Sequence, residues 1–327
     1  MKKTVLKLVL VYITCIFLTG CSRNIEPISK SGFYFDTVIT VTLYDTEQID
    51  LLDDCFSLAK KYENLFSKTI ETSDVYKINH SNGEATVVDK ETLYLIEKAV
   101  FYAKLSDGAI DPTVLPLSDL WAFGENETVP DIDAVALALS NVNYENIIID
   151  NAASSVTLKD PNAGIDLGFI AKGYIADKMK EYLTSKGVKS GLINLGGNIL
   201  TIGEKPNKTS YLLGIKKPFS KDNSTIKNVS VKDKSLVTSG IYERCFYEND
   251  ILYHHILNTK TGYPITNEVV SVTILSDSSM EGDAYSTMCL CLGLKEGMEL
   301  IEATEGLEAL FITDDMKLHY SSGFPKN

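Results

Sequence analysis

Strand-like and helix-like segments follow one another along this chain without a regular repeat. Residues 33–45, FYFDTVITVTLYD, alternate in polarity and are rich in β-branched and aromatic residues, so they predict a strand. Residues 49–67 and 90–108 instead place apolar residues at helical spacing, and Gly108 ends the second of these segments. A doubly wound fold needs strands and helices in regular alternation, so the irregular mixture predicts an α+β fold.

The rest of the chain continues the same mixture. The predicted elements are helices over 131–142 and 167–186, helices starting near Asp283 and Lys295, paired short strands within 146–159 and 190–203, and a closing strand over 307–315. No shift in composition marks a domain boundary. We therefore predict one folded unit over residues 31–327, with mixed sheets flanked by helices.

The first twenty residues have the pattern of a secretory signal. Three lysines precede an apolar run of about eleven residues, which is too short for a membrane-spanning helix of roughly 20. The run ends in LTGC, residues 18–21, which resembles the lipobox of bacterial lipoproteins. We expect residues 1–20 to be a lipoprotein signal peptide and Cys21 to be lipidated; the alternative is a plain signal with an incidental cysteine. Residues 21–30 are expected to tether the domain to the bacterial cell membrane, outside the cytoplasm.

The net charge restricts the kinds of partner. The full sequence carries a formal charge of −13, and removal of the three lysines in residues 1–20 brings it to −16. This acidic balance argues against nucleic acid as a partner. An anionic substrate would have to be held by local cations, because the overall field repels it.

The stretch DLGFIAKGY, residues 166–174, places a lysine at the start of a predicted helix. A helix N-terminus has unpaired N–H groups and about half a positive charge, so Lys172 costs the helix roughly 0.3–1 kcal/mol there. A bound anion reverses the sign, since the N–H groups, the dipole and the ammonium all favour it. Gly168 and Gly173 leave room for a ligand or a closely packed strand. The stretch thus predicts a phosphate or pyrophosphate site; the alternative is a surface lysine beside packing glycines.

A second segment, EGDAYSTM at residues 281–288, predicts part of a metal site. Asp283 and Thr287 lie four residues apart, so a helix would place them on one face. Two hard oxygen donors suit Mg²⁺, which takes one or two protein oxygens and leaves its other positions to water and substrate phosphates. As alternatives, Asp283 could be a helix N-cap and Thr287 a core residue.

Six motifs in a fixed order resemble the ApbE family, the FAD:protein FMN transferases. Along the chain they are GAIDPT, DLGFIAKGY, NLGGNI, TSGIYER, HHILNTKTGYP and DAYSTM. Each motif alone is weak evidence for the family, but the order of the six motifs is specific to it. Many family members also carry a lipoprotein signal. The resemblance covers about residues 33 to 320, nearly all of the chain after the signal.

The resemblance implies an α+β fold that binds FAD in a central cleft, together with Mg²⁺. Family members transfer the FMN half of FAD onto a Thr or Ser hydroxyl of a partner protein and release AMP. The implied partners are membrane redox proteins that carry the acceptor hydroxyl. The alternatives are a magnesium-dependent FAD pyrophosphatase, in which water is the acceptor, and a non-catalytic lipoprotein that stores or delivers flavin.

The resemblance also assigns roles to individual residues. The metal ligands would be Asp283, Thr287 and the backbone carbonyl of Phe169. Lys172 would contact an FAD phosphate and hold charge near the scissile bond. His255 would be either the base for the incoming hydroxyl or a residue that orients the flavin or diphosphate. Further FAD contacts would come from Asp166, from the segment Ala109, Ile110 and Asp111, from Leu257, and from Phe35 and Thr69 near the N-terminus.

Two positions depart from the family pattern. Phe169 stands where a small residue is usual, so its side chain must find a pocket while its carbonyl binds the metal. Asn258-Thr259 replaces Asp-Pro after the histidine motif, which predicts a looser turn without a carboxylate. His254, beside His255, is expected to be structural or exposed, because successive strand residues face opposite sides.

Overall fold

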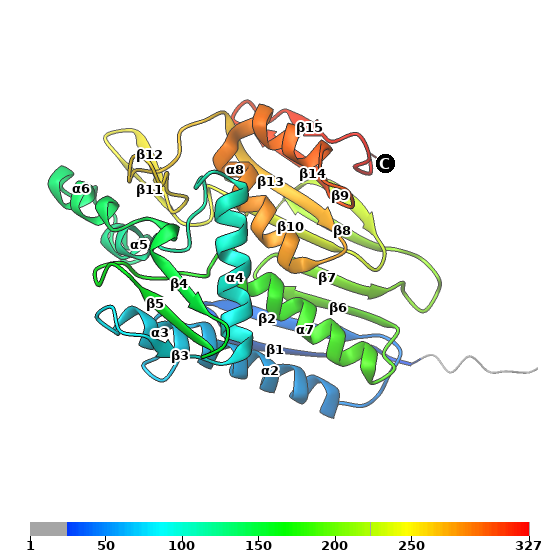
Figure 1. Ribbon diagram of the computed structural model, residues 1–327. Coiled ribbons are helices and arrows are strands. Elements are labelled where there is room, and N and C mark those ends of the chain that lie inside the picture. The colour runs from blue at the N-terminus through cyan, green and yellow to red at the C-terminus, as the bar shows by residue number, and fades with distance from the viewer. Residues whose placement is uncertain (1–24, 223, 327) are drawn as a thin grey trace, which may run out of the picture.

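The computed structural model describes residues 25–222 and 224–326, and it is built around one large sheet (Figure 1). Eight strands follow the order β1-β2-β6-β7-β10-β13-β14-β15, and each neighbouring pair is antiparallel. Their bounds are β1 (Ile28–Tyr34), β2 (Thr37–Leu43), β6 (Ser190–Leu195), β7 (Asn198–Gly203), β10 (Ser235–Gly240), β13 (Val269–Ser276), β14 (Glu308–Thr313) and β15 (Leu318–Tyr320). The predicted signal, 1–20, and Cys21 lie outside the described residues.

Long helices cover one face of this sheet (Figure 1). They are α2 (Asp50–Phe66), α4 (Lys90–Leu105), α7 (Ala171–Ser185) and α8 (Ser279–Glu302). Of these, α2, α7 and α8 pack on the strands, and α4 lies outside them with Tyr102 against Tyr285 of α8. The mixture of helices with an antiparallel sheet confirms the α+β prediction. Within the described residues, no helix has both the length and the apolar character needed to cross a bilayer.

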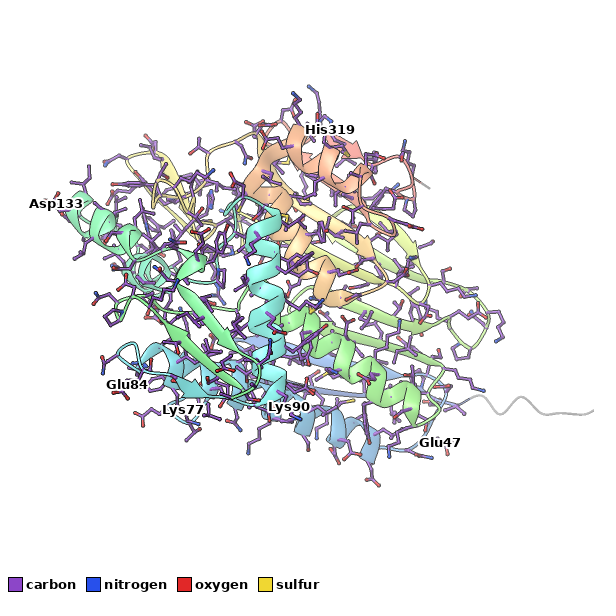
Figure 2. All side chains as sticks on the ribbon, viewed as in Figure 1. Glu47, Lys77, Glu84, Lys90, Asp133 and His319 are labelled. Carbon is purple, nitrogen blue, oxygen red and sulfur yellow. The ribbon has the colours of Figure 1, made fainter. Side chains whose placement is uncertain are left out.

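Smaller elements surround this core. They are the sheet β3 (Thr86–Val87), β5 (Ser155–Leu158) and β4 (Ile147–Asp150), the hairpins β8 (Tyr211–Lys216) with β9 (Thr225–Val231) and β11 (Cys245–Glu248) with β12 (Ile251–His254), the helices α3 (Asp74–Asn79), α5 (Leu115–Trp121) and α6 (Ile132–Ser140), and a short 3₁₀ turn, Tyr144–Asn146. A second buried cluster joins the β11–β12 hairpin to α5, since the fully buried Trp121 stacks on Tyr253. Exposed charged side chains such as Glu84 and Asp133 project from the periphery (Figure 2).

The segment 33–45, predicted as one strand, is a hairpin. β1 ends at Tyr34, β2 begins at Thr37, and Phe35 and Asp36 connect them with φ values of 52° and 54°. Such a two-residue turn is usually signalled by Asn-Gly or Asp-Gly, and Phe-Asp carries neither signal. β1 begins at Ile28, within the stretch predicted as a tether.

Two predicted helices begin at different residues in the structure. α7 begins at Ala171 rather than near 167, because the preceding residues form turns. The helix expected from Asp283 begins earlier, at Ser279, so Asp283 is not the N-cap of its own helix; that position belongs to Ser278. The second helical stretch, expected near Lys295, follows a break at Gly293, where φ is 81°.

α7 and α8 meet at their N-terminal ends (Figure 1), and their backbones are in contact at Gly173. A Cβ at this position would lie 2.2 Å from the carbonyl oxygen of Ser279 and 2.6 Å from the Cα of Met280. Backbone atoms cannot move aside as a flexible side-chain tip can. Gly173 therefore allows the starts of the two helices to approach closely. This is the packing role that the sequence allowed, although the partner is a helix and not a strand.

Replacing Gly173 with Ala should lower the free energy of unfolding by about 1–3 kcal/mol or more, the range for overpacking a tight contact. Gly168→Ala is the matched control, because its Cβ would approach only a side-chain oxygen of Asp166, at 3.0 Å. Urea denaturation followed by circular dichroism measures both variants. Equal stability of the two variants would contradict the backbone contact between α7 and α8 at Gly173.

Candidate functional site

The start of α7 lacks a capping group of its own. Its N-cap, Ile170, offers no side-chain acceptor, and no acidic residue lies in the first turn. The Lys172 ammonium donates to the carbonyl of Gly168 at 2.9 Å and lies 3.9 Å from Oδ1 of Asp283. In the part of the chain that the structure describes, no acceptor pairs with the backbone N–H of Lys172. An unpaired N–H, a helix dipole and an ammonium thus gather at one place.

Asp283 reaches this place from α8. Its Oδ2 accepts the backbone N–H of Gly173 at 2.9 Å, so α8 supplies the cap that α7 lacks. The carboxyl group is buried, with 4% of the residue exposed. Burial raises its pKa, although Lys172 and the Gly173 N–H lower it in part. Asp283 is therefore a buried carboxylate whose charge is not fully compensated by the protein.

The capping is mutual, because α7 also caps α8. The carboxylate of Asp177 on α7 accepts the N–H groups of Ser279 at 2.8 Å and Met280 at 3.0 Å, and the hydroxyl of Ser278 at 2.7 Å. The sequence carries no local signal for this arrangement, since Asp177 lies mid-helix and its partners are about a hundred residues away. The two helix starts are consequently fixed relative to each other.

Thr287 lies one helical turn after Asp283. Its hydroxyl is 3.4 Å from the carbonyl oxygen of Asp283 and 3.1 Å from the hydroxyl of Ser239 on β10. Ser239 in turn lies 2.8 Å from the hydroxyl of Ser286. A strand hydroxyl from the TSGIYER motif therefore orients Thr287, a contact that the sequence did not predict.

The backbone carbonyl of Phe169 is available as a third oxygen. The N–H of Gly173, which an ordinary helix would pair with this carbonyl, goes to Asp283 instead. Among residues 25–222 and 224–326 no hydrogen bond reaches the Phe169 carbonyl. The half-buried Phe169 ring packs on the large core, which is the pocket that the bulky residue required.

These oxygens fit a hard divalent cation. A buried carboxylate, a hydroxyl and a free carbonyl are the donor types that Mg²⁺ takes from proteins. No three His, Cys, Asp or Glu side chains of the described residues converge as metal ligands, so an all-protein cage is not what they form. Asp283, Thr287 and the Phe169 carbonyl remain the predicted ligands.

His255 approaches from the β11–β12 hairpin. Its ring Nδ1 lies 3.3 Å from the carbonyl oxygen of Arg244, which only accepts, so we assign the proton to Nδ1 and the free lone pair to Nε2. Burial, the charge of Arg244 and, less strongly, that of Lys172 lower the pKa of His255 to about 4. The ring is therefore neutral at pH 7, and it lies within electrostatic reach of Lys172.

His254 faces the other side of the strand and is structural, which is one of the two roles that the sequence allowed. Its buried ring places Nε2 3.2 Å from the carbonyl of Ile265, while Nδ1 accepts the N–H of Ile256 at 3.4 Å. Burial lowers the pKa of His254 to about 4. The neutral ring ties the hairpin to the segment that follows it.

Asp166 orients the turn before α7. Its Oδ1 accepts the N–H of Gly168 at 2.8 Å, and its Oδ2 lies 3.2 Å from the ammonium of Lys68. Lys68 also pairs with Asp119 at 2.9 Å. Burial opposes the charge of Lys68, but the two carboxylates outweigh it and raise its pKa. Thr69 follows Lys68 in sequence and is exposed, with its hydroxyl 3.1 Å from that of Ser67, and its predicted contact with FAD stays a prediction.

The GAIDPT segment is fixed by internal hydrogen bonds. Buried Asp111 accepts the N–H of Thr113 at 2.7 Å and that of Tyr144 at 2.9 Å, so both carboxylate oxygens hold the loop. Ile110 is buried in the large core and Ala109 is half-buried. The structure thus gives Asp111 a role in loop shape, and the predicted contact of this segment with the nucleotide stays a prediction.

Leu257 and Phe35 occupy different surroundings. Leu257 is 7% exposed and packs in the second cluster with Trp121. Phe35 lies in the β1–β2 turn, where its N–H donates to Glu63 at 2.8 Å and its half-buried ring packs against the large core. The structure brings Lys172 close to the Asp283 carboxylate and Thr287 close to the Asp283 backbone, whereas it places Phe35 in a turn of the N-terminal hairpin.

The Asn258-Thr259 departure does not loosen the turn, contrary to the prediction. The amide oxygen of Asn258 accepts the N–H groups of Lys260 at 2.8 Å and Thr261 at 3.1 Å, as a carboxylate oxygen would. Thr259, in place of proline, donates its hydroxyl to the carbonyl of Gly108. The substituted residues therefore close the turn and also bind it to the GAIDPT segment.

Comparison with known proteins gives one consistent result. The chain matches the sequence profile of the ApbE family over residues 35–311. It is 36% identical over 296 residues to an FAD:protein FMN transferase of Klebsiella pneumoniae (strain 342), covering 90% of this chain and 92% of that protein. For the FAD:protein FMN transferase of Treponema pallidum (strain Nichols), the identity is 33% over 335 residues, covering 96% and 92%.

Solved structures agree with the sequence relatives. The structure of the ApbE protein from Thermotoga maritima has a TM-score of 0.83 at 30% identity and covers 91% of this chain and 97% of that one. The flavin transferase ApbE from Vibrio cholerae has a TM-score of 0.82 at 28% identity, with coverage of 91% and 98%.

The buried His254 predicts a pH-dependent stability. With a pKa of about 4 in the folded state against 6.5 ordinarily, its contribution is complete above pH 6.5 and is lost as the pH falls toward 4. His254→Gln, whose amide keeps a donor and an acceptor, should not show this loss. Between pH 7 and 4 the wild type should lose on the order of 3 kcal/mol relative to the variant. Parallel pH profiles in urea denaturation would contradict the assignment.

Proposed function

Because this chain belongs to the ApbE family, we propose that it transfers the FMN half of FAD onto a Thr or Ser hydroxyl of a partner protein, releases AMP and depends on Mg²⁺. It is an FAD:protein FMN transferase with FAD as its substrate. The magnesium dependence, the acceptor residue and the AMP product are our inference. The observation that carries them is the meeting of Lys172 with the buried Asp283, 3.9 Å apart, at the start of α7.

In this proposal the diphosphate of FAD lies at the start of α7. The unpaired N–H of Lys172, the helix dipole and the Lys172 ammonium all favour an anion there. The local cation is needed because the rest of the protein is acidic. Asp166 supports the site through its hydrogen bond to Gly168, which sets the turn that leads into the helix. FAD would extend from this point into a cleft.

Asp283, Thr287 and the carbonyl of Phe169 would hold Mg²⁺. The bound ion supplies Lewis-acid polarisation of the diphosphate oxygens, worth several kcal/mol in phosphoryl transfer. The chain's own contribution is to keep Asp283 buried and hydrogen-bonded to Gly173, so that one carboxylate oxygen stays directed at the site. Lys172 neutralises the charge that develops on the departing phosphate oxygen.

His255 would accept the proton of the incoming hydroxyl at Nε2. Its Nδ1 proton is engaged by the Arg244 carbonyl, which fixes the ring orientation and leaves Nε2 free. A pKa of about 4 makes the ring a weak base in the protein alone. The anionic diphosphate would raise that pKa toward the working pH, because a nearby negative charge stabilises the protonated ring.

We also propose that the enzyme works outside the cytoplasm as a lipid-anchored protein of the bacterial membrane. The support is the signal pattern of residues 1–20 and the LTGC sequence that ends at Cys21. β1 begins at Ile28, so a short linker would separate the anchor from the folded domain. Membrane redox proteins would be the acceptors.

Two measurements on the purified protein test the reaction. Incubation with FAD and Mg²⁺ should release AMP only when a peptide or protein with the acceptor Thr or Ser is present, and the acceptor should gain the mass of FMN. AMP release without an acceptor would indicate a pyrophosphatase instead. FAD binding without any AMP would indicate a flavin carrier.

Asp283→Asn should abolish AMP release while leaving the fold intact. The amide oxygen can still accept the Gly173 N–H but gives up the charge that holds Mg²⁺, so we expect a loss of more than about 100-fold. Asp283→Ala should lose the activity and also about 0.5–2 kcal/mol of stability, the cost of a missing cap. Wild-type turnover of Asp283→Asn at saturating Mg²⁺ would rule out the metal assignment.

His255→Gln separates a base from an orienting residue. If His255 accepts the proton, turnover of the variant should fall by about 10²–10⁴-fold, and the decline of the wild-type rate at low pH should disappear. The pH dependence of turnover at saturating FAD is the measurement. A variant that is slow but keeps the wild-type pH profile would show that His255 only orients the substrate.

A further inference from the structure

Arg244 is the single arginine among the described residues. The sequence has 29 lysines but only two arginines, and the other, Arg23, lies before residue 25. Arg244 ends the TSGIYER motif, and no role in the reaction has been given to its side chain above. A guanidinium differs from an ammonium in offering a planar fork of donors that matches phosphate oxygens.

The β11–β12 register places Arg244 directly opposite His255. Cys245 pairs with His254, and the N–H of His255 donates to the Arg244 carbonyl at 3.1 Å, so the pairing continues by one more residue. Residues directly opposite each other in an antiparallel pair have their side chains on the same face. Arg244 and His255 therefore share one face of the hairpin. The charge of Lys172 acts on the same histidine, whose pKa it helps to lower.

The guanidinium of Arg244 has no carboxylate partner within the described residues, and the residue is exposed. Its neighbour Glu243 is paired with Lys216 at 3.5 Å and so does not neutralise it. Lys68 and Lys180, by contrast, each pair with a carboxylate. An unpaired guanidinium beside a functional histidine is therefore open to an anionic ligand.

We propose that Arg244 binds a phosphate oxygen of FAD, so that Arg244 and Lys172 hold the diphosphate from the hairpin and from the helix. This inference rests on the proposed function and names a binding residue that the motif alone does not assign. The hairpin then contributes two groups to the site: His255 for the proton and Arg244 for the charge. The second buried cluster, which contains Trp121, packs against the hairpin that carries both residues.

Binding measurements with three probes test this assignment. Dissociation constants for FAD, ADP and riboflavin are determined for the wild type, Arg244→Ala, Arg244→Lys and Lys317→Ala. Loss of Arg244 should weaken the binding of FAD and ADP by roughly 10- to 100-fold, the range for a lost hydrogen bond to a charged group. The affinity for riboflavin should stay unchanged. The FAD and ADP affinities of Arg244→Lys should lie between those of the wild type and Arg244→Ala, because lysine keeps the charge but lacks the planar set of donors. Lys317→Ala, which removes one exposed positive charge from the β14–β15 turn where it pairs with Asp315, should match the wild type.

Three results would overturn the inference. Unchanged FAD and ADP affinities in Arg244→Ala would show that Arg244 does not touch the diphosphate. An equal loss of riboflavin affinity would show that the variant distorts the hairpin. A loss confined to the acceptor's KM would place Arg244 at the acceptor. AMP release and acceptor modification, with the acceptor's KM, are measured in parallel for the wild type and Arg244→Ala, so a failure of the proposed function is seen separately from a failure of Arg244.

Discussion

The mutual capping of α7 and α8 is the interaction on which the site depends. Each helix start would otherwise leave buried N–H groups unpaired, and each such group costs about 1–3 kcal/mol. Asp283 of α8 pairs with an N–H of α7, and Asp177 of α7 pairs with two N–H groups of α8. The exchange works only because Gly173 lets the two backbones touch. The position of Lys172 relative to Asp283 follows from this contact between the two helix starts.

In the proposed function the same carboxylate serves both stability and chemistry. Asp283 gives one oxygen to Gly173 and leaves the other facing Lys172, and its burial raises its pKa. A buried anion with partial compensation is unfavourable in the protein alone and favours a cation nearby. The carbonyl of Phe169 is free for the same reason, since its usual helical donor goes to Asp283. The structural cap thus creates two of the three predicted metal ligands.

Local patterns in the sequence were sufficient for much of this arrangement, and long-range contacts were not. Helical spacing and the four-residue interval predicted that Asp283 and Thr287 share a helix face, because that geometry depends only on the helix itself. The β1–β2 turn was missed because Phe35 and Asp36 carry no turn signal. Asp177 and Lys68 were missed because their partners are distant in sequence, and nothing near either residue indicates them. The looser turn expected at Asn258 was wrong, since an amide oxygen accepts the same N–H groups.

The site combines parts that are anchored in two different cores. Lys172, Asp283 and Thr287 stand on helices packed against the large sheet, whereas His255 and Arg244 stand on a hairpin packed against Trp121. Thr259 bonds to Gly108, and Asp111 holds the same loop, so the hairpin is linked to the rest by polar contacts as well as by packing. In the proposed function the helices would hold the cation and the diphosphate in fixed positions, and the hairpin would bring His255 to them. A substitution in the Trp121 cluster would then alter the reaction without touching FAD, because it would move His255 relative to Lys172.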